Sequence, residues 1–344
     1  MDNKPLSRRG FLKQTTKIAG AGLALTLVNS LTTTKFPAFY EKKVDAATNS
    51  FRFVVLGDSR GELHGTNEIT LRSLMDKVKG LSVQPNFVMF TGDQVFGGVD
   101  VELQLIEWKD IVNDYYPDNM IYPALGNHEH DETVFSKVFN YLPNEQLPGY
   151  QRSAYYFDYG NARFIVMNSD RKKTAVNIQH YPDYVITDEQ RNWLENLLAT
   201  SDKTHHFVMF HVPAYPIGSH HGKSLDANPI ERDAVWDVLD KYNVTAVMVG
   251  HEHNYNRRKI DSSFNGNGYT FNNSIQQVTL GGAGAPLNNT NKDSRNVEVG
   301  PAAKEHYMVV DVVGGQANFQ VYDKENNVID SFTVNRSKKK VGNK

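Results

Sequence analysis

The sequence predicts an α/β fold in which two β-sheets pack face to face and helices cover their outer sides. The first observation is a series of strand–helix units between residues 51 and 125, in which each strand ends in polar residues. The second is a run of strands without helices between residues 275 and 334. No internal repeat, long linker or low-complexity segment follows residue 50, so we expect one domain over residues 51–335.

The amino-terminal half of this domain supplies the strand–helix units. Three short apolar runs predict strands at 51–56, 87–90 and 120–125. Apolar residues at helical spacing predict one helix around 71–78 and another over 103–115, and a third helical pattern follows Glu129.

The carboxyl-terminal half begins with a hairpin and a helix. Gly160-Asn161 lies between apolar runs at 154–159 and 163–167 and predicts a tight turn. Thr187 and Gln190 form a capping box, which predicts the start of a helix. Further strands are expected at 207–210, 244–249, 275–280, 307–312, 317–322 and 328–334. A polar loop at 213–228 and a helix near 235–239 separate the first two of these strands.

The charge balance limits the classes of function. The first 46 residues carry 8 of the 37 basic and 3 of the 39 acidic side chains, so 29 basic and 36 acidic side chains remain. A net negative charge argues against a nucleic-acid-binding surface. The basic tail, residues 336–344, is expected to be solvated.

Cysteine is absent from the chain. A disulfide framework and a thiolate metal site are therefore both excluded. Any metal ion must be held by His, Asp, Glu or Asn, and these ligands suit Mn, Fe or Zn. The sequence carries no signal for the oligomeric state.

The amino end has the features of an export signal. Arg8 and Arg9 precede an apolar run of about 14 residues, which is short for a membrane span. With Ser7 before the pair and Phe11 after it, the segment resembles a twin-arginine signal. We therefore expect residues 1–46 to direct export through the twin-arginine translocase, with cleavage after Ala46. A chance arginine pair in an ordinary signal and an uncleaved anchor are the alternatives.

Ionisable or amide side chains follow five of the predicted strands. They are Asp58, Asp93, Asn127 with His128, His211, and His251 with His253. Ligand crevices of α/β sheets lie at the carboxyl ends of strands, so we expect these residues to lie together. Six of the seven are plausible metal ligands. Two metals about 3.5–4 Å apart, joined by a bridging carboxylate, clamp the attacking and leaving oxygens of a phosphoryl transfer.

The chain resembles the calcineurin-like metallophosphoesterases, which include the purple acid phosphatases. The resemblance rests on Gly57-Asp58, Gly92-Asp93, Gly126-Asn127-His128-Glu129, His211 and Gly250-His251-Glu252-His253, in this order. It covers about residues 51–255. It implies a four-layer αββα sandwich, two metal ions, and hydrolysis of phosphate mono- or diesters by a hydroxide held between the metals.

The resemblance also implies a role for each motif residue. Asp93 would bridge both metals, with Asp58 and His253 on the first metal and Asn127, His211 and His251 on the second. His128 would lie over the site and stabilise the transition state or protonate the leaving alkoxide. We expect Glu129 to fix His128 or a backbone amide rather than to bind metal.

Two positions depart from the family pattern. Arg60 stands where a ligand His is usual, and Phe96 stands where purple acid phosphatases have a Tyr. Neither side chain offers a lone pair to a metal. Asp58, Asp93 and His253 still leave a workable three-ligand site. Arg60 either grips a substrate phosphate, pairs with Asp58 or another carboxylate, or marks a weakened site.

Several further histidines are weaker candidates. His220 and His221, in the polar loop, are candidate substrate contacts. His64 and His130 are possible rim residues, with a helix start as the alternative at His130, and His205 and His206 are expected to be structural or exposed. The glycine-rich segment 281–286 is expected to form a tight turn; the family resemblance offers the alternative that it approaches the metal site.

These observations predict an exported, metal-dependent phosphoesterase that acts on a small-molecule or polymeric phosphate ester. The alternative is a non-catalytic metal-binding or interaction protein of the same fold. Arg60 in place of a ligand His favours that alternative.

Overall fold

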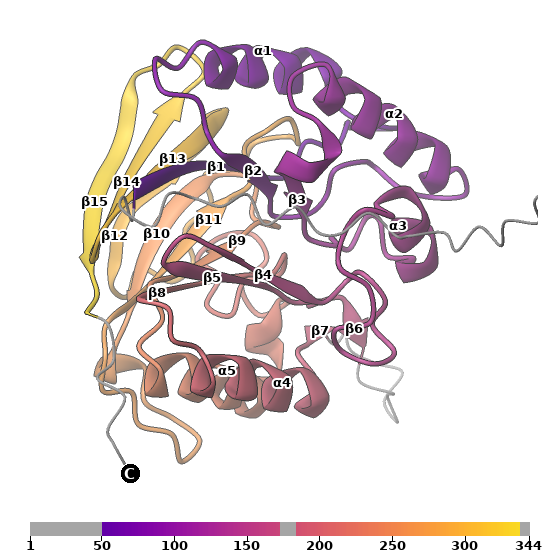
Figure 1. Ribbon diagram of the computed structural model, residues 1–344. Coiled ribbons are helices and arrows are strands. Elements are labelled where there is room, and N and C mark those ends of the chain that lie inside the picture. Colours follow the sequence, from indigo (N-terminus) through magenta and orange to yellow (C-terminus); the bar gives the residue numbers. More distant parts are fainter. Residues whose placement is uncertain (1–49, 173–183, 338–344) are drawn as a thin grey trace, which may run out of the picture. The chain divides into compact units, whose positions relative to one another are not determined.

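The computed structural model describes residues 50–172 and 184–337 (Figure 1). The expected export signal, residues 1–46, and residues 338–344 of the basic tail lie outside the described residues. Within the described ranges, no helix is long and apolar enough to cross a membrane.

Six strands form the first sheet, in the order β15-β14-β13-β1-β2-β3. Their bounds are β1 (Ser50–Leu56), β2 (Phe87–Phe90), β3 (Ile121–Pro123), β13 (His306–Val313), β14 (Gln316–Asp323) and β15 (Val328–Asn335). β1, β2 and β3 run parallel, as strand–helix units require, and β13 joins β1 in the antiparallel direction.

Seven strands form the second sheet, in the order β12-β10-β11-β9-β8-β5-β4. Their bounds are β4 (Tyr155–Tyr159), β5 (Ala162–Val166), β8 (His205–Met209), β9 (Ala246–Val249), β10 (Tyr255–Ile260), β11 (Ile275–Leu280) and β12 (Val297–Ala302). β5, β8, β9 and β11 are parallel, whereas β4, β10 and β12 pair in the antiparallel direction. A separate two-stranded sheet joins β6 (Arg171–Lys172) to β7 (Tyr184–Val185).

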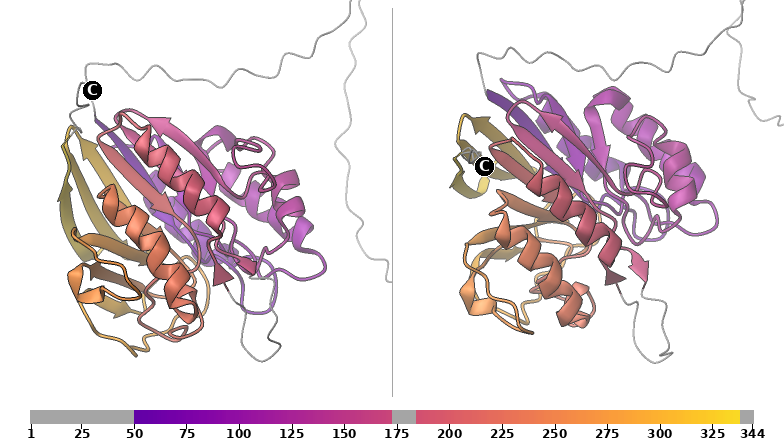
Figure 2. Two further views of the ribbon diagram at one scale, coloured as in Figure 1. Left: turned by 90° about the horizontal axis from the view of Figure 1, so that it is seen from below. Right: turned by 60° about the horizontal axis from the view of Figure 1, so that its bottom comes forward.

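Helices cover the outer faces of both sheets, so the predicted fold class is confirmed. The helices α1 (Glu68–Lys79), α2 (Val101–Asn113) and α3 (Glu132–Val138) lie on one side, and α4 (Asp188–Ala199) and α5 (Pro229–Lys241) lie on the other (Figure 1). α4 and α5 run side by side (Figure 2). Three single 3-10 turns occupy Asp118–Met120, Leu225–Ala227 and Ser262–Phe264.

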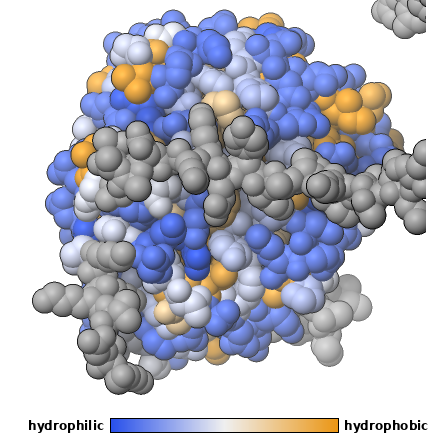
Figure 3. All heavy atoms as spheres, in the orientation of Figure 1, coloured by the Kyte–Doolittle hydropathy of each residue, from blue (hydrophilic) through white to orange (hydrophobic). Residues whose placement is uncertain are grey.

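Aromatic side chains hold the two sheets together. Phe53 of β1 lies 5.4 Å from Phe87 of β2, and Phe164 of β5 lies 5.0 Å from Phe207 of β8, ring centroid to centroid. The two pairs also meet edge to face across the sheets, at 5.1 Å between Phe53 and Phe207. Such edge-to-face contacts add to the stabilisation from burying large apolar rings. Apolar side chains on the visible outer face form only small, separate patches (Figure 3).

Most elements lie close to their predicted positions. β2 and β11 have the predicted bounds, and β3 is shorter than the run at 120–125. α4 begins at Asp188 because the Thr187 side chain accepts a hydrogen bond from the Gln190 N–H, as the capping box predicts. The sequence pattern predicts neither β10 and β12 nor the short strands β6 and β7.

β10 does not read as a strand in the sequence because it contains two adjacent arginines, which the fold buries. Arg257 donates to Asp330 of β15 (Nε to Oδ2, 2.7 Å), and Arg258 donates to Asp293 (Nη2 to Oδ2, 2.6 Å). The Tyr255 hydroxyl also donates to Asp330, at 2.6 Å. Asp330 therefore joins β10 of the second sheet to β15 of the first through a buried charged network.

We expect Asp330→Ala to lower the free energy of unfolding by about 3–5 kcal/mol, because it removes the buried carboxylate nearest the Arg257 guanidinium and leaves only the more exposed Glu298, at 3.7 Å. Glu195→Ala is the control, since its partner Lys241 is exposed and such pairs contribute at most about 1 kcal/mol. Urea unfolding of both variants tests this. Equal small losses in the two variants would show that water reaches Arg257.

Candidate metal centre

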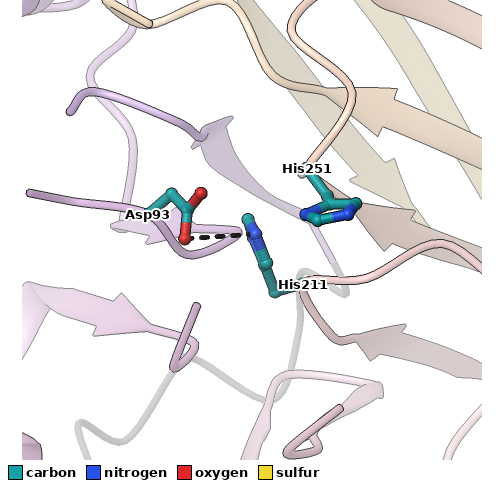
Figure 4. Close-up of side chains that lie close together, drawn as sticks. All are labelled: Asp93, His211 and His251. Carbon is teal, nitrogen blue, oxygen red and sulfur yellow. Dashed lines mark ion pairs between the residues drawn. The ribbon is translucent and has the colours of Figure 1, made fainter. Parts of the chain in front are cut away.

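The carboxyl ends of five strands meet at one edge of the sandwich. The loops after β1, β2 and β3 of the first sheet lie against those after β8 and β9 of the second. Figure 4 shows Asp93, from the first sheet, beside His211 and His251, from the second. The structure thus brings all six predicted metal ligands together.

One candidate ligand group is formed by Asp93, His211 and His251, and all three side chains are buried. His211 Nε2 lies 3.2 Å from Asp93 Oδ1 and 3.1 Å from Asn127 Oδ1. His251 Nδ1 lies 2.8 Å from the same Asn127 oxygen. Four donor side chains therefore converge on one point.

The orientation of His211 is set by its other nitrogen. His211 Nδ1–H donates to the Thr91 carbonyl oxygen at 2.9 Å, which turns Nε2 towards Asp93. Burial disfavours the charged ring, but the Asp93 carboxylate outweighs it and raises the pKa of His211 to about 10. The surroundings of His211 therefore stabilise a positive charge, and either a proton or a metal ion can supply it.

A second candidate group is formed by Asp58, Asp93 and His253. His253 Nε2 lies 3.7 Å from Asp58 Oδ1, and His253 Nδ1–H donates to the Pro286 carbonyl oxygen at 3.0 Å. Burial lowers the pKa of His253 to about 4, so its ring is neutral, as a ligand must be. Asp93 belongs to both groups, so one carboxylate links them.

The donor set fits a pair of metal ions. Asp58 and Asp93 are both buried, and burial of Asp58 raises its pKa to about 8. His251 Nε2 is buried and has no hydrogen-bond partner among the described residues. Buried carboxylates and unpaired imidazole nitrogens at short range are stabilised by a bound cation. Imidazole and carboxylate ligands without thiolates suit Mn, Fe or Zn.

The backbone is bent into the left-handed region at three of the six ligands. Asp58 has φ of 58°, Asp93 of 51° and His251 of 69°. Gly250 precedes His251, and a Cβ atom there would lie 2.4 Å from Asp58 Oδ2. Glycine is required at this position because the loop after β9 passes so close to the carboxylate.

Two buried glutamates hold the loops in place. Glu129 accepts hydrogen bonds from the backbone N–H groups of Asp93 (3.0 Å), Val95 (3.0 Å) and Gly126 (2.9 Å), so it binds backbone amides as expected. Glu252 accepts from the N–H groups of Ile217 and Gly218, at 2.9 and 2.7 Å. This anchoring role of Glu252 was not predicted, although its place between two ligand histidines is a signal in the sequence.

His128 presents one ring nitrogen to the site. Its Nδ1–H donates to the Phe96 carbonyl oxygen at 2.6 Å, and its Nε2 lies 3.8 Å from Asp93 Oδ2. The side chain is about a quarter exposed, in contrast to the buried ligands. This places His128 at the open side of the metal ligands.

Arg60 has no ion pair with Asp58 or another carboxylate among the described residues. Its Nη1 donates to the Gly61 carbonyl oxygen at 3.0 Å, and its Nε is buried without a partner there. The guanidinium carbon lies 5.9 Å from the centre of the Phe96 ring. Arg60 therefore lies near the site with guanidinium N–H groups that remain available to donate hydrogen bonds.

The two loop histidines have different surroundings. The His220 ring lies 4.2 Å from the His251 ring and 6.2 Å from the His253 ring, so the structure brings it to the site. Burial lowers the pKa of His220 to about 4. His221 instead lies 3.8 Å from Asp293 and 4.0 Å from Asp226, with no described contact to the ligand groups.

The remaining candidates have structural partners. His64 pairs with Asp100 and His130 with Asp170, each at 2.8 Å, and the Asp131 carboxylate caps α3. His205 and His206 are buried in β8. Segment 281–286 does approach the site, through the Pro286 carbonyl. Tyr184, whose ring lies 5.5 Å from that of His251, was not predicted, because nothing in its local sequence marks it.

Comparison with curated proteins finds distant relatives among phosphatases and phosphodiesterases. Human tartrate-resistant acid phosphatase type 5 is 25% identical over 303 residues, which cover 82% of this chain and 87% of that protein. Human acid sphingomyelinase-like phosphodiesterase 3b is 24% identical over 170 residues, or 42% of this chain. The matched part is only 37% of the phosphodiesterase's length.

Solved structures show the same fold. The purple acid phosphatase PPD1 from yellow lupin (Lupinus luteus) seeds superposes with a TM-score of 0.65 at 18% identity. The match covers 84% of this chain and 54% of the lupin chain. At this identity the likeness supports the two-sheet architecture.

Membership of a family follows from the sequence match. Residues 51–255, more than half of the chain, match the family model for calcineurin-like phosphoesterases. The matched segment contains all five strand-exit motifs that build the ligand groups, and the predicted enzyme class, a hydrolase of phosphoric esters, agrees with it. The chain belongs to the calcineurin-like phosphoesterase family.

Proposed function

We propose that this protein hydrolyses phosphate mono- or diesters with the help of two metal ions. The observation that carries the proposal is the convergence of five donor side chains around the buried Asp93 in a member of a phosphoesterase family. No single sheet supplies these donors, so the arrangement is a feature of the whole fold.

The ligand groups define which residues would hold each metal. Asp93 would serve both ions, Asp58 and His253 the first, and Asn127, His211 and His251 the second. When bound, such a pair lowers the pKa of water and neutralises charge on the phosphate oxygens. The protein's part is to fix the ligands and to place its other side chains around the phosphate.

His128 is suited to act on the leaving oxygen. Its Nδ1 is committed to the Phe96 carbonyl, so only Nε2 can give or accept a proton at the site. That nitrogen lies 3.8 Å from Asp93 Oδ2, so it faces the ligand groups. We assign His128 the role of proton donor, or of transition-state stabiliser, at the leaving oxygen.

Arg60 is suited to hold a phosphate oxygen. Its planar guanidinium matches phosphate geometry, and the structure shows no carboxylate that neutralises it within the described residues. His220, over the ligand histidines, is placed to contact the same group, whereas His221 faces acidic side chains. We therefore keep Arg60 and His220 as substrate-binding residues and regard His221 as the weaker candidate.

We further propose that the protein acts beyond the cytoplasmic membrane after transport by the twin-arginine translocase. The support is the Ser7-Arg8-Arg9-Gly10-Phe11 motif before an apolar run. A non-catalytic, metal-binding protein of this fold is the competing hypothesis. The observation in its favour is that the first metal would have three protein ligands, since Arg60 replaces the usual histidine.

Asp93→Asn tests the hydrolase directly. We expect kcat/KM for p-nitrophenyl phosphate or its bis ester to fall by at least about 100-fold and metal content to drop, because Asp93 serves both ions. Elemental analysis should accompany assays with Mn, Fe, Zn and Ca. Asp114→Asn, at the exposed end of α2, is the control. Absence of hydrolysis with every metal in the unmodified protein would favour the non-catalytic hypothesis.

Arg60→Ala separates phosphate binding from metal binding. A lost charged hydrogen bond costs about 1.5–3 kcal/mol, so we expect kcat/KM to fall about 10- to 100-fold, mainly through KM, with metal content unchanged. Arg60→Lys should restore part of the loss. Arg72→Ala, on the exposed side of α1, is the control. Metal loss in Arg60→Ala would instead assign Arg60 a structural role.

Replacing both Arg8 and Arg9 by Lys tests the export route. The change keeps the positive charge but removes the paired guanidinium groups, so we expect full-length protein to accumulate in the cytoplasm. Lys13→Arg is the control, and cell fractionation with a carboxyl-terminal tag is the measurement. Unchanged export of the double variant would indicate an ordinary signal.

A further inference from the structure

A pocket of about 850 Å³ opens beside His128. Its walls come from the loop after β2, the start of α2, the segment before α3, and Tyr184. Of the six candidate metal ligands, only Asn127 lines it. The pocket therefore extends away from the metal ligands on the side of His128.

The position of His128 identifies which part of a substrate would enter this pocket. This step rests on the proposed function, in which His128 acts at the leaving oxygen as proton donor or as transition-state stabiliser. The group attached to that oxygen must then lie on the His128 side, whereas the phosphoryl group lies over the metal ligands. The pocket is thus placed to receive the leaving alcohol.

Part of the pocket wall is apolar. The rings of Phe96 and Tyr184 and the side chain of Val99 line it, and Val99 is fully exposed to solvent. A solvent-exposed valine beside two aromatic rings favours a ligand with an apolar surface. Aromatic faces also attract organic cations.

The charged part of the wall is acidic. Glu102, Asp131 and Asp170 line the pocket, and no Lys or Arg does so among the described residues. Lys137, the partner of Glu102, is about two-thirds exposed, and Asp170 pairs with His130. Arg60 lies against Phe96 but is not part of the wall. A leaving alcohol with its own negative charge would therefore meet like charges.

We propose that this pocket is the leaving-group subsite, and that it selects phosphate esters of neutral or cationic alcohols with apolar surface. Esters of alcohols that carry further phosphate or carboxylate groups, such as nucleoside 3',5'-bisphosphates, are disfavoured. The acidic wall excludes them by repulsion, and the rings and Val99 bind the preferred alcohols.

Three aryl esters that differ in charge test the proposal. They are phenyl phosphates with a nitro, a carboxylate or a trimethylammonium group in the para position, assayed as monoesters and as methyl diesters. After correction for the leaving-group pKa, we expect the carboxylate ester to have the lowest kcat/KM. The difference should shrink as ionic strength rises, because salt screens the wall.

Charge variants at the wall provide the decisive comparison. Glu102→Lys and Val99→Lys should each raise kcat/KM for the carboxylate ester relative to the trimethylammonium ester by about three- to tenfold. Glu102→Lys breaks the ion pair with Lys137 and could impair folding. Val99→Lys leaves that pair intact, so it tests the same charge effect without this risk. Glu107→Lys is the matched control, since it lies exposed on α2 but does not line the pocket.

The outcomes separate this inference from the proposed function. Equal hydrolysis of the three esters, or equal shifts in Glu102→Lys and Glu107→Lys, overturns the subsite assignment while the hydrolase stands. Failure to cleave any of the esters with any metal overturns the proposed function and the subsite with it. A shift confined to the two wall variants supports the subsite.

Discussion

The packing of one sheet against the other is the constraint on which the metal centre depends. Phe53 and Phe87 of the first sheet interlock with Phe164 and Phe207 of the second, with edge-to-face distances of 5.1 Å between the sheets. This contact aligns the strand ends, so that the loops after β1, β2 and β3 face those after β8 and β9. Asp93 comes from one sheet and His211 from the other, so the ligand groups exist only when both sheets are docked.

Burial of two carboxyl groups is the cost of this arrangement. Asp58 and Asp93 are both removed from water. Among the ligand histidines, burial keeps His251 and His253 neutral, and His211 depends on Asp93 for its charge. A metal ion that binds the native protein and not the unfolded chain therefore stabilises the fold through the same ligands. Glu129 and Glu252 add to this by fixing the ligand loops through backbone N–H groups. This anchoring role explains why a buried glutamate follows His128 and His251 in the sequence.

Much of the fold and of the ligand set could be predicted because both rest on local patterns. Apolar runs that end in Asp58, Asp93 or His211 identify strands and their exits together, and the Thr187 capping box fixes the start of α4. β10 could not be predicted, because its arginines read as exposed until Asp330 and Asp293, distant in sequence, are seen to pair with them. Tyr184 and the contact of His220 with His251 likewise depend on long-range packing that no local pattern records.

The left-handed backbone at Asp58, Asp93 and His251 restricts which residue types these positions can accept. Asp, Asn and His tolerate positive φ far better than longer or β-branched residues do. A glutamate at position 58 or 93 would keep the carboxylate but would have to adopt a backbone conformation it disfavours. Two criteria therefore limit the residue types at these positions: the ability to bind a metal and tolerance of the left-handed backbone conformation. A search for functional homologues can use both criteria, since glutamate satisfies the first and is disfavoured by the second.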